Sequence, residues 1–340
     1  MATPSRTWHL FAASLLAVTM GATPSRTADL EPVTIGTSRP AGPEQGGYYQ
    51  AIADGSYRKY GLAVTIRQFA PGTEPARLVA VGELDFSIDG DSFQQHALAR
   101  DQVPVVSIAA IFQKDRLAVL AHPAAGVRRF EDLRGRTVFA ADDAGRTLWP
   151  WLRTRFGLDQ GQLRSAPTVP ERLLAEPGPV LLADVVATAL ARPDVPEPAV
   201  LLPADDVYYT YTGTVQAATT RIAGAPELVQ RFVDATIEGW YRYLYGDAAA
   251  AHRLIMAANP GLHAERLAPA RTAIRRHGLI DSSHALIMGI GAMDGGHWVN
   301  FWKTTLGRRG HQASDFSRLY TLQFVNQGHG MALKERLLGG

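Results

Sequence analysis

Five aspartates stand where an apolar strand is predicted to end and a helix to begin. Asp89 and Asp91 lie in SIDGDS, Asp142 and Asp143 in AADDAG, and Asp184 in LLADVV. Open α/β sheets bind small molecules outside the carboxyl ends of their strands. Carboxylates there accept paired N–H donors, and an aromatic side chain can stack on a flat ring. The pattern indicates a site for a flat heteroaromatic or amine-bearing solute.

Other polar and aromatic residues are expected at the same edge. They are Thr37, Gln45, Gly47, Tyr48, Ser92, Trp149, Tyr209 and Tyr211. The alternative is that each aspartate caps its own helix and points away from the solute, because Asp is among the preferred capping residues. Arg39 and Arg146 could also neutralise part of the negative charge. The sequence does not decide between contact and capping.

Motifs for catalysis are missing from the sequence. There is no HExxH, no GxSxG and no GxxxxGK[ST], and the glycines of GIGAMDGG (289–296) do not fit a dinucleotide loop. The absence of cysteine excludes a disulfide framework and any thiolate nucleophile or metal ligand. We therefore predict a protein that is not an enzyme, with no catalytic residue, metal site or cofactor.

Composition and the first residues predict an exported protein of two domains. The 340 residues are 46% hydrophobic, and 34 basic residues are interspersed with 32 acidic ones, so no basic stripe suggests nucleic acid. Arg6 precedes an apolar run from Leu10 to Ala22, shorter than the roughly 20 residues of a spanning helix. We predict a signal peptide over residues 1–22, cleaved near Gly21 or Ala22, and a monomer in the periplasm.

Strands and helices alternate at the spacing of βαβ units, which predicts mostly parallel sheets with right-handed crossovers. The first unit has strands at 32–38, 62–69, 85–88 and 103–112, with helices at 46–61, 73–84 and 91–101, the last capped by Asp91 or Ser92. The second has strands at 137–141, 180–183 and 199–203, with helices at 146–157 and 185–191. From Pro226 onward the pattern is helical, and Trp240, Tyr241 and Tyr243 fall at core spacing on the first of these helices.

Several segments resemble one family in the expected order. They are GGYYQAIADGSYRKYGLAVTI, LVAVGELDFSI, VPVVSIAAIFQKD, LAVLAHPAAGVRRFEDLRGRTV and ELVQRFVDATIEGWYRYLYGD. This order resembles periplasmic substrate-binding proteins of ABC importers, in the group that includes receptors for nitrate, for taurine and other sulfonates, and for the pyrimidine precursor of thiamine. One departure is Asp184-Val185-Val186, where the family commonly has a Gly, Tyr or Ser-Glu-Pro stretch.

The resemblance implies a type 2 binding-protein fold, with two α/β lobes closing over a solute and C-terminal helices packed on lobe 1. It places lobe 1 at residues 30–117 plus 217–340 and lobe 2 at 118–216, with crossing segments near Leu117–Leu120 and Thr214–Ala217. The implied partners are a small-molecule solute and the membrane subunits of an ABC importer, with no nucleic acid.

The solute is expected to resemble a thiamine pyrimidine precursor, because five carboxylates would repel an oxyanion in a cleft of low dielectric. The alternative is a sulfonate such as taurine, or nitrate. An alternative of another class is an enzyme like the fungal thiamine-pyrimidine synthases, which share the fold. Those enzymes use a lysine-bound pyridoxal cofactor and a cysteine-rich segment, and this chain has no cysteine.

Overall fold

The computed structural model describes residues 1, 29–140, 142–166, 177–191, 200–203, 208, 210–307, 310 and 315–339. Apart from Met1, the predicted signal peptide and its cleavage site lie outside the described residues, as does Tyr209. Within the described part, no helix combines the length and apolar character needed to cross a membrane.

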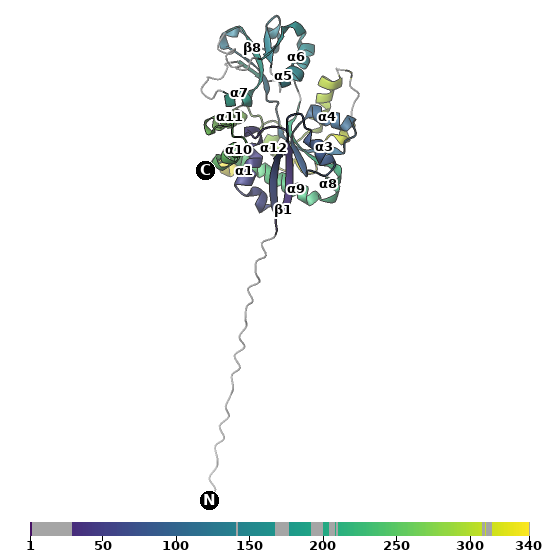
Figure 1. Ribbon diagram of the computed structural model, residues 1–340, viewed down its shortest axis with the longest axis vertical. Helices are drawn as coiled ribbons and strands as arrows, with labels where there is room; N and C mark the ends of the chain where they lie inside the picture. The colour runs from purple at the N-terminus through teal and green to yellow at the C-terminus, as the bar shows by residue number, and fades with distance from the viewer. Residues whose placement is uncertain are drawn as a thin grey trace.

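The first sheet forms the centre of the lower lobe in Figure 1, lobe 1. Its five strands run in the order β2-β1-β3-β10-β4. They are β1 (Glu31–Thr37), β2 (Leu62–Gln68), β3 (Phe86–Asp91), β4 (Val105–Phe112) and β10 (Thr212–Ala218). β1 pairs in parallel with β2 and β3, whereas β10 is antiparallel to both β3 and β4. Every residue of β4 is buried although β4 is at the edge of the sheet, because Gly291 and Tyr320 of the C-terminal region form isolated β-bridges with Ala110 and Ser107 of this strand.

The second sheet forms lobe 2, in the order β7-β6-β8-β5-β9. Its strands are β5 (Leu117–Ala121), β6 (Val138–Ala140), β7 (Leu163–Ser165), β8 (Val180–Asp184) and β9 (Val200–Pro203). β6 is parallel to β7 and β8, and β5 is antiparallel to β8 and β9. The two sheets confirm the α/β fold of two lobes. The sequence did not predict β7, because three residues are too few to show an alternating pattern.

The crossings between the lobes differ from the prediction. Leu117–Leu120 and Thr214–Ala217 are not connecting segments but parts of strands β5 and β10. The chain instead leaves lobe 1 after Phe112, through residues 113–116, and returns between β9 and β10. A strand entered directly from the other lobe starts where its parallel neighbours end, which explains why β5 and β10 are the antiparallel strands.

The helices cover both sheets and make up most of the C-terminal third. They are α1 (Gly46–Ala53), α2 (Ser56–Lys59), α3 (Pro75–Ala80), α4 (Ser92–Arg100), α5 (Asp142–Arg146), α6 (Leu148–Phe156), α7 (Val185–Ala191), α8 (Thr219–Gly224), α9 (Pro226–Tyr245), α10 (Ala249–Ala258), α11 (Ala264–Arg276), α12 (Ala285–Met288), α13 (Gly295–Phe301) and α14 (Met331–Gly339). The helix predicted over 46–61 is two helices, because Gly55 takes a left-handed φ of 78° between them.

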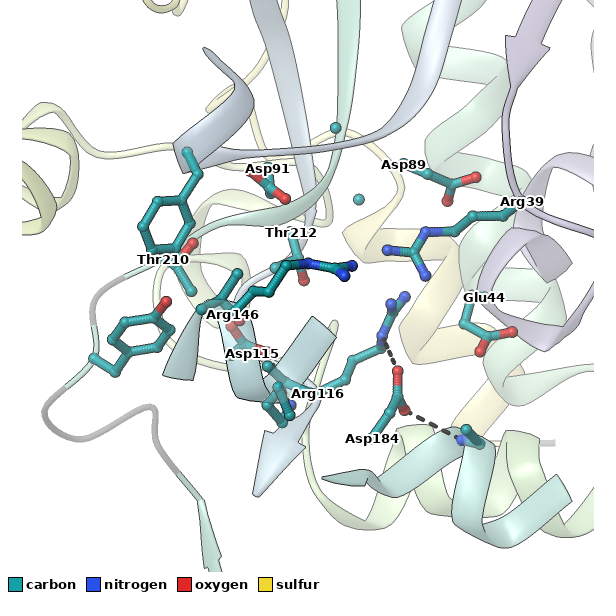
Figure 2. Close-up of a pocket in the computed structure, with 18 residues that line it drawn as sticks. Arg39, Glu44, Asp89, Asp91, Asp115, Arg116, Arg146, Asp184, Thr210 and Thr212 are labelled. Atoms are coloured by element: carbon teal, nitrogen blue, oxygen red, sulfur yellow. Dashed lines mark hydrogen bonds and ion pairs between the residues drawn. The ribbon is translucent and has the colours of Figure 1, made fainter. Parts of the chain in front are cut away.

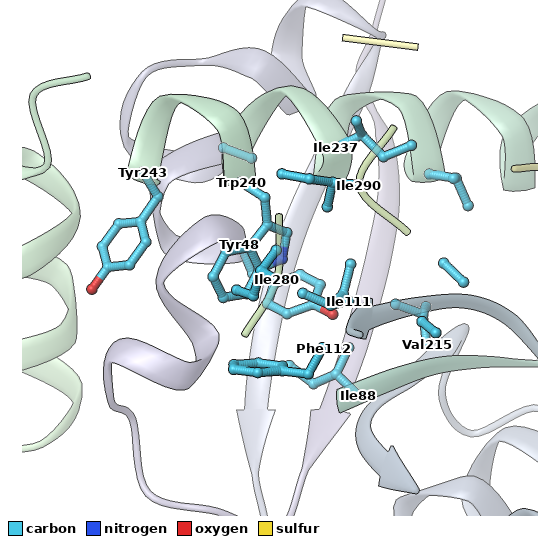
Figure 3. Packing of buried hydrophobic residues seen from close by; sticks show 14 of the residues in the cluster. Tyr48, Ile88, Ile111, Phe112, Val215, Ile237, Trp240, Tyr243, Ile280 and Ile290 are labelled. Carbon is cyan, nitrogen blue, oxygen red and sulfur yellow. The ribbon is translucent and has the colours of Figure 1, made fainter. Parts of the chain in front are cut away.

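The core of lobe 1 is built around α9 (Figure 3). Trp240 is fully buried and meets Tyr48 edge to face, with ring centres 5.8 Å apart. A Cβ placed on Gly47 would lie 2.2 Å from the Trp240 ring, so only glycine allows α1 and α9 to approach this closely. Gly47 and Tyr48, predicted to contact the solute, therefore pack α1 against α9 and do not line the cavity described below.

The C-terminal helices also reach lobe 2. α11 packs against α7, and the two lie side by side at the left of Figure 1. Val186 of α7 belongs to the same buried apolar cluster as Leu267, Ala270 and Ile274 of α11. The lobes are thus joined by an apolar contact as well as by the crossing segments.

Candidate ligand cavity between the lobes

A cavity of about 570 Å³ lies between the lobes, within the size range of small-molecule sites. Lobe 1 contributes the loop after β1 and the carboxyl end of β3, and lobe 2 contributes α5 and the junction of β8 with α7. The two crossings and the strands that they enter also line it, through residues 115–117 and through Tyr208, Thr210, Thr212 and Gly213. Strand ends from both sheets meet at this cavity, as the sequence predicted for the solute site.

Arginine side chains occupy the middle of the cavity. Figure 2 shows Arg39, Arg116 and Arg146 pointing toward one another from lobe 1, the first crossing and α5. Arg116 is only 8% exposed, and its guanidinium carbon lies 5.2 Å from the centre of the Phe112 ring. Burial opposes its charge, but surrounding carboxylates, Asp184 foremost, outweigh burial and raise its pKa. Arg116 therefore carries a fixed positive charge inside the cavity.

Two of the predicted aspartates are held by protein groups. Asp184 accepts a hydrogen bond from Arg116 Nε at 2.9 Å, and its other oxygen accepts from the backbone N–H groups of Val186 and Ala187 at 2.8 and 3.2 Å. It thus pairs with Arg116 and caps the start of α7.

Asp89 accepts hydrogen bonds from Thr37 Oγ1 at 2.6 Å and from Gln45 Nε2 at 2.8 Å. Thr37 and Gln45 do not line the cavity, so they orient Asp89 instead of contacting a solute there. The Asp89 backbone has a left-handed φ of 67° within β3, where the register between β3 and β10 is irregular.

The other carboxylates that line the cavity are less fully engaged. Asp91 caps α4 by accepting from Gln94 N at 2.8 Å, as the sequence predicted. Asp115 accepts from Leu117 N at 2.8 Å, and burial raises its pKa to about 6. Burial likewise raises the pKa of Asp91 and of Glu44. The surrounding protein groups therefore do not fully compensate the negative charges of Asp91, Asp115 and Glu44.

Ser92 and Tyr211 tie α4 to the second crossing. Tyr211 N donates to Ser92 Oγ at 2.9 Å, and Tyr211 Oη accepts from Asp294 N at 2.9 Å. The Tyr211 ring stacks on His297 with centres 3.9 Å apart. Both predicted residues are buried and do not line the cavity, so they support the crossing.

Trp149 also lies away from the cavity. It is 1% exposed in the apolar core of lobe 2, where its Nε1 donates to Gln160 Oε1 at 3.2 Å. Helix α6 begins at Leu148, and the side chains of Leu148, Trp149 and Leu152 lie on the face of this helix that packs into the core. The structure describes the backbone of Asp142 and Asp143 but not their side chains.

Aromatic residues that the sequence did not single out form another wall of the cavity. Phe93 of α4 and Tyr208 both line it, with ring centres 6.2 Å apart. Tyr208 also lies 5.3 Å from Trp151 in the core of lobe 2, and Phe93 lies 4.8 Å from Phe301 of α13. This aromatic wall therefore connects the two lobes.

The sequence also missed Glu44, Asp115 and Arg116 as cavity residues. Asp115 and Arg116 lie shortly after the end of β4 at Phe112, so the strand-end rule that selected the other aspartates would have found them. No metal-binding group of three or more His, Asp or Glu residues occurs in the part of the chain that the structure describes.

A comparison with known protein families identifies the family to which the chain belongs. A family model described as "NMT1/THI5 like" matches residues 42–249, more than half of the sequence. The chain belongs to the NMT1/THI5-like family. A search of curated proteins found no significant match to this NMT1/THI5-like protein.

Solved structures share the fold at low sequence identity. The periplasmic aliphatic sulphonate binding protein SsuA from Escherichia coli gives a TM-score of 0.62 at 14% identity, covering 86% of this chain and 92% of that one. The putative sulfonate-binding SsuA of an ABC transporter from Methylobacillus flagellatus gives 0.56 at 17%, covering 92% and 96%. The desulfurization enzyme DSZB gives 0.54 at 12%, covering 89% and 99%. The periplasmic-binding-protein fold inferred from the sequence is confirmed, and it is a fold that also carries an enzyme.

Proposed function

We propose that this NMT1/THI5-like protein is the solute-binding component of an ABC importer and that its solute carries an acidic group. The observation that supports this most is the convergence of Arg39, Arg116 and Arg146 in a cavity between two lobes. The solute would be released to the membrane subunits of the importer. The receptors SsuA with the same fold bind sulfonates by name, which agrees with an acidic solute.

Arg39 and Arg116 have N–H groups available to a solute. Among the described residues, Asp184 engages Arg116 only through Nε, and the Arg39 guanidinium makes no hydrogen bond. A guanidinium presents a planar fork of donors that matches the oxygens of a carboxylate or sulfonate. Like charges facing one another inside a cavity repel, and an anionic group between them relieves that repulsion.

The aspartates oppose the binding of an acidic solute less than the sequence alone suggested. Asp184 is paired with Arg116, and one oxygen of Asp89 accepts hydrogen bonds from Thr37 and Gln45, so protein groups already engage both carboxylates. The sulfonate alternative therefore fits the cavity better than the thiamine pyrimidine precursor. The pyrimidine remains the second candidate, because Asp91 and Asp115 could accept its N–H groups beside the ring of Phe93.

Substitution of the arginines tests the proposal. We expect Arg39→Gln and Arg146→Gln each to weaken binding of a short sulfonate or carboxylate by about 10-fold or more, since hydrogen bonds to charged groups contribute about 1.5–3 kcal/mol. Arg253→Gln, on the exposed face of α10, is the matched control and should leave the affinity unchanged. Equal affinities in all four proteins, measured by calorimetry, would contradict the proposal.

Export and an enzymatic alternative have their own tests. We propose that residues 1–22 direct the chain to the periplasm and are removed. A periplasmic protein whose mass includes Met1 would refute removal, and a protein confined to the cytoplasm would refute export. An enzyme like the thiamine-pyrimidine synthases needs a lysine for pyridoxal phosphate, and the described residues lining the cavity include none. Schiff-base absorbance on adding pyridoxal phosphate would favour the enzyme; we expect none.

A further inference from the structure

Among the described residues that line the cavity, more side chains are negative than positive. Arg39, Arg116 and Arg146 face five carboxylates, those of Glu44, Asp89, Asp91, Asp115 and Asp184. With every group ionised the lining has a formal charge of minus two, and a purely anionic solute would make the imbalance larger. A site selective for simple anions has no need for this excess of buried carboxylates.

Asp115 is a buried cavity carboxylate with an oxygen available to a ligand. It is 9% exposed and lines the cavity, and only its Oδ1 is bonded, to Leu117 N. Its Oδ2 has no hydrogen-bond partner among the described residues. The charged groups that face it are Arg116 on its own segment, Asp184 of β8 and Asp91 of β3. Two of these three are carboxylates, so Asp115 lies in a locally negative part of the cavity.

Asp91 lies on the lobe 1 side of the same region. It caps α4 through Oδ1, and Arg39 and Arg116 are the cations that influence it. Burial raises the pKa of Asp91 and of Asp115 despite these arginines. Both carboxylates would therefore gain from a positive charge brought by the solute.

The aromatic wall is well placed for the same group. Phe93 and Tyr208 line the cavity together with Asp91 and Asp115. Phe93 follows Asp91 by two residues at the start of α4, so its ring and that carboxylate come from one short segment. An ammonium group is stabilised both by a carboxylate and by the face of an aromatic ring.

We propose that the solute is zwitterionic, with its acidic group on the arginines and a protonated amine on Asp91 and Asp115 beside Phe93 and Tyr208. This inference rests on the proposed function, because it assumes that the arginines bind an acid. A zwitterion satisfies both charge sets without adding net charge to the cavity. Its amine is then the feature that distinguishes it from a simple sulfonate or carboxylate of the same length.

Matched pairs of small molecules test the inference by calorimetry on the mature protein. The pairs are ethanesulfonate with 2-aminoethanesulfonate and propionate with 3-aminopropionate, and propylamine serves as the amine without an acid. We expect the amine-bearing member of at least one pair to bind 10-fold or more tightly than its partner. Simple acids that bind as well as their amino forms would overturn the zwitterion and leave the proposed function intact. Propylamine as the tightest ligand, or no binding by any acid, would overturn the proposed function itself.

Substitution of Asp91 and Asp115 tests whether these two carboxylates cause the preference for the amino form of the solute. Asp91→Asn and Asp115→Asn keep an oxygen that can accept the backbone N–H, so the local fold should persist. We expect each to reduce the preference for the amino form to under threefold while the simple acid binds as before or more tightly. Asp247→Asn is the control, because Asp247 accepts from Ala249 N at 2.9 Å at an exposed helix start outside the cavity lining. Equal losses for both members of a pair would mean that Asp91 and Asp115 only support the fold, and the inference would fail.

Discussion

Replacing Arg116 with methionine should destabilise the protein by about 3 kcal/mol, because it removes one partner of a largely buried ion pair. The Arg116 side chain is 9% exposed and that of Asp184 is 21% exposed. Asp184 would be left near Glu44 and Asp115 without its cation. Water reaches part of Asp184, which keeps the expected loss at the lower end of the range of about 3–5 kcal/mol for breaking buried pairs.

A double-mutant cycle isolates the pair from other effects of the substitution. Asp184→Asn retains an oxygen for Val186 N and Ala187 N, so it should cost less, about 1–2 kcal/mol. The Arg116→Met, Asp184→Asn double variant should be more stable than the sum of the single losses predicts, by about 1.5 kcal/mol or more. Urea denaturation at pH 7 measures all four proteins. Strictly additive losses would refute the idea that Asp184 holds Arg116 in the cavity.

Two further predictions concern stability. Burial lowers the pKa of His96 and of His297 to about 4, so the fold favours the neutral rings. Their contribution is complete above the ordinary pKa of about 6.5 and is lost as pH falls toward 4, where only the unfolded chain takes up protons. For His96 this is about 3 kcal/mol, and a free energy of unfolding that is equal at pH 7 and pH 4.5 would contradict it. Gly47→Ala should destabilise by about 2 kcal/mol or more, since its Cβ would overlap the Trp240 ring, whereas Gly224→Ala meets no atom within 4 Å and should be nearly neutral in the same denaturation assay.

The fold could be predicted because its signals are local and repeated. Alternating strands and helices predict parallel sheets, and the apolar spacing of α9 predicts a buried face that includes Trp240. The break at Gly55 and the strands β5 and β10 were missed because they depend on tertiary contacts. Residues 117–121 and 212–218 look like any apolar connection until the sheet that they join is known.

The site was harder to predict because one residue type serves two purposes. An aspartate at a strand end can cap a helix or face a ligand, and its identity is the same in both cases. The structure shows that Asp91 and Asp184 cap helices and still line the cavity, so the two alternatives were not exclusive. The ion pair of Arg116 could not be predicted from the sequence, because its partner Asp184 is 68 positions away along the chain.

The most direct test of the proposed function is a calorimetric titration of the purified protein with ethanesulfonate and, separately, with an aminopyrimidine. The convergence of Arg39, Arg116 and Arg146 predicts saturable binding of the sulfonate that weakens in Arg146→Gln. Tight binding of the aminopyrimidine, with no heat from the sulfonate in wild type, would contradict an acidic solute. It would instead favour a nitrogen-rich solute bound by the aspartates.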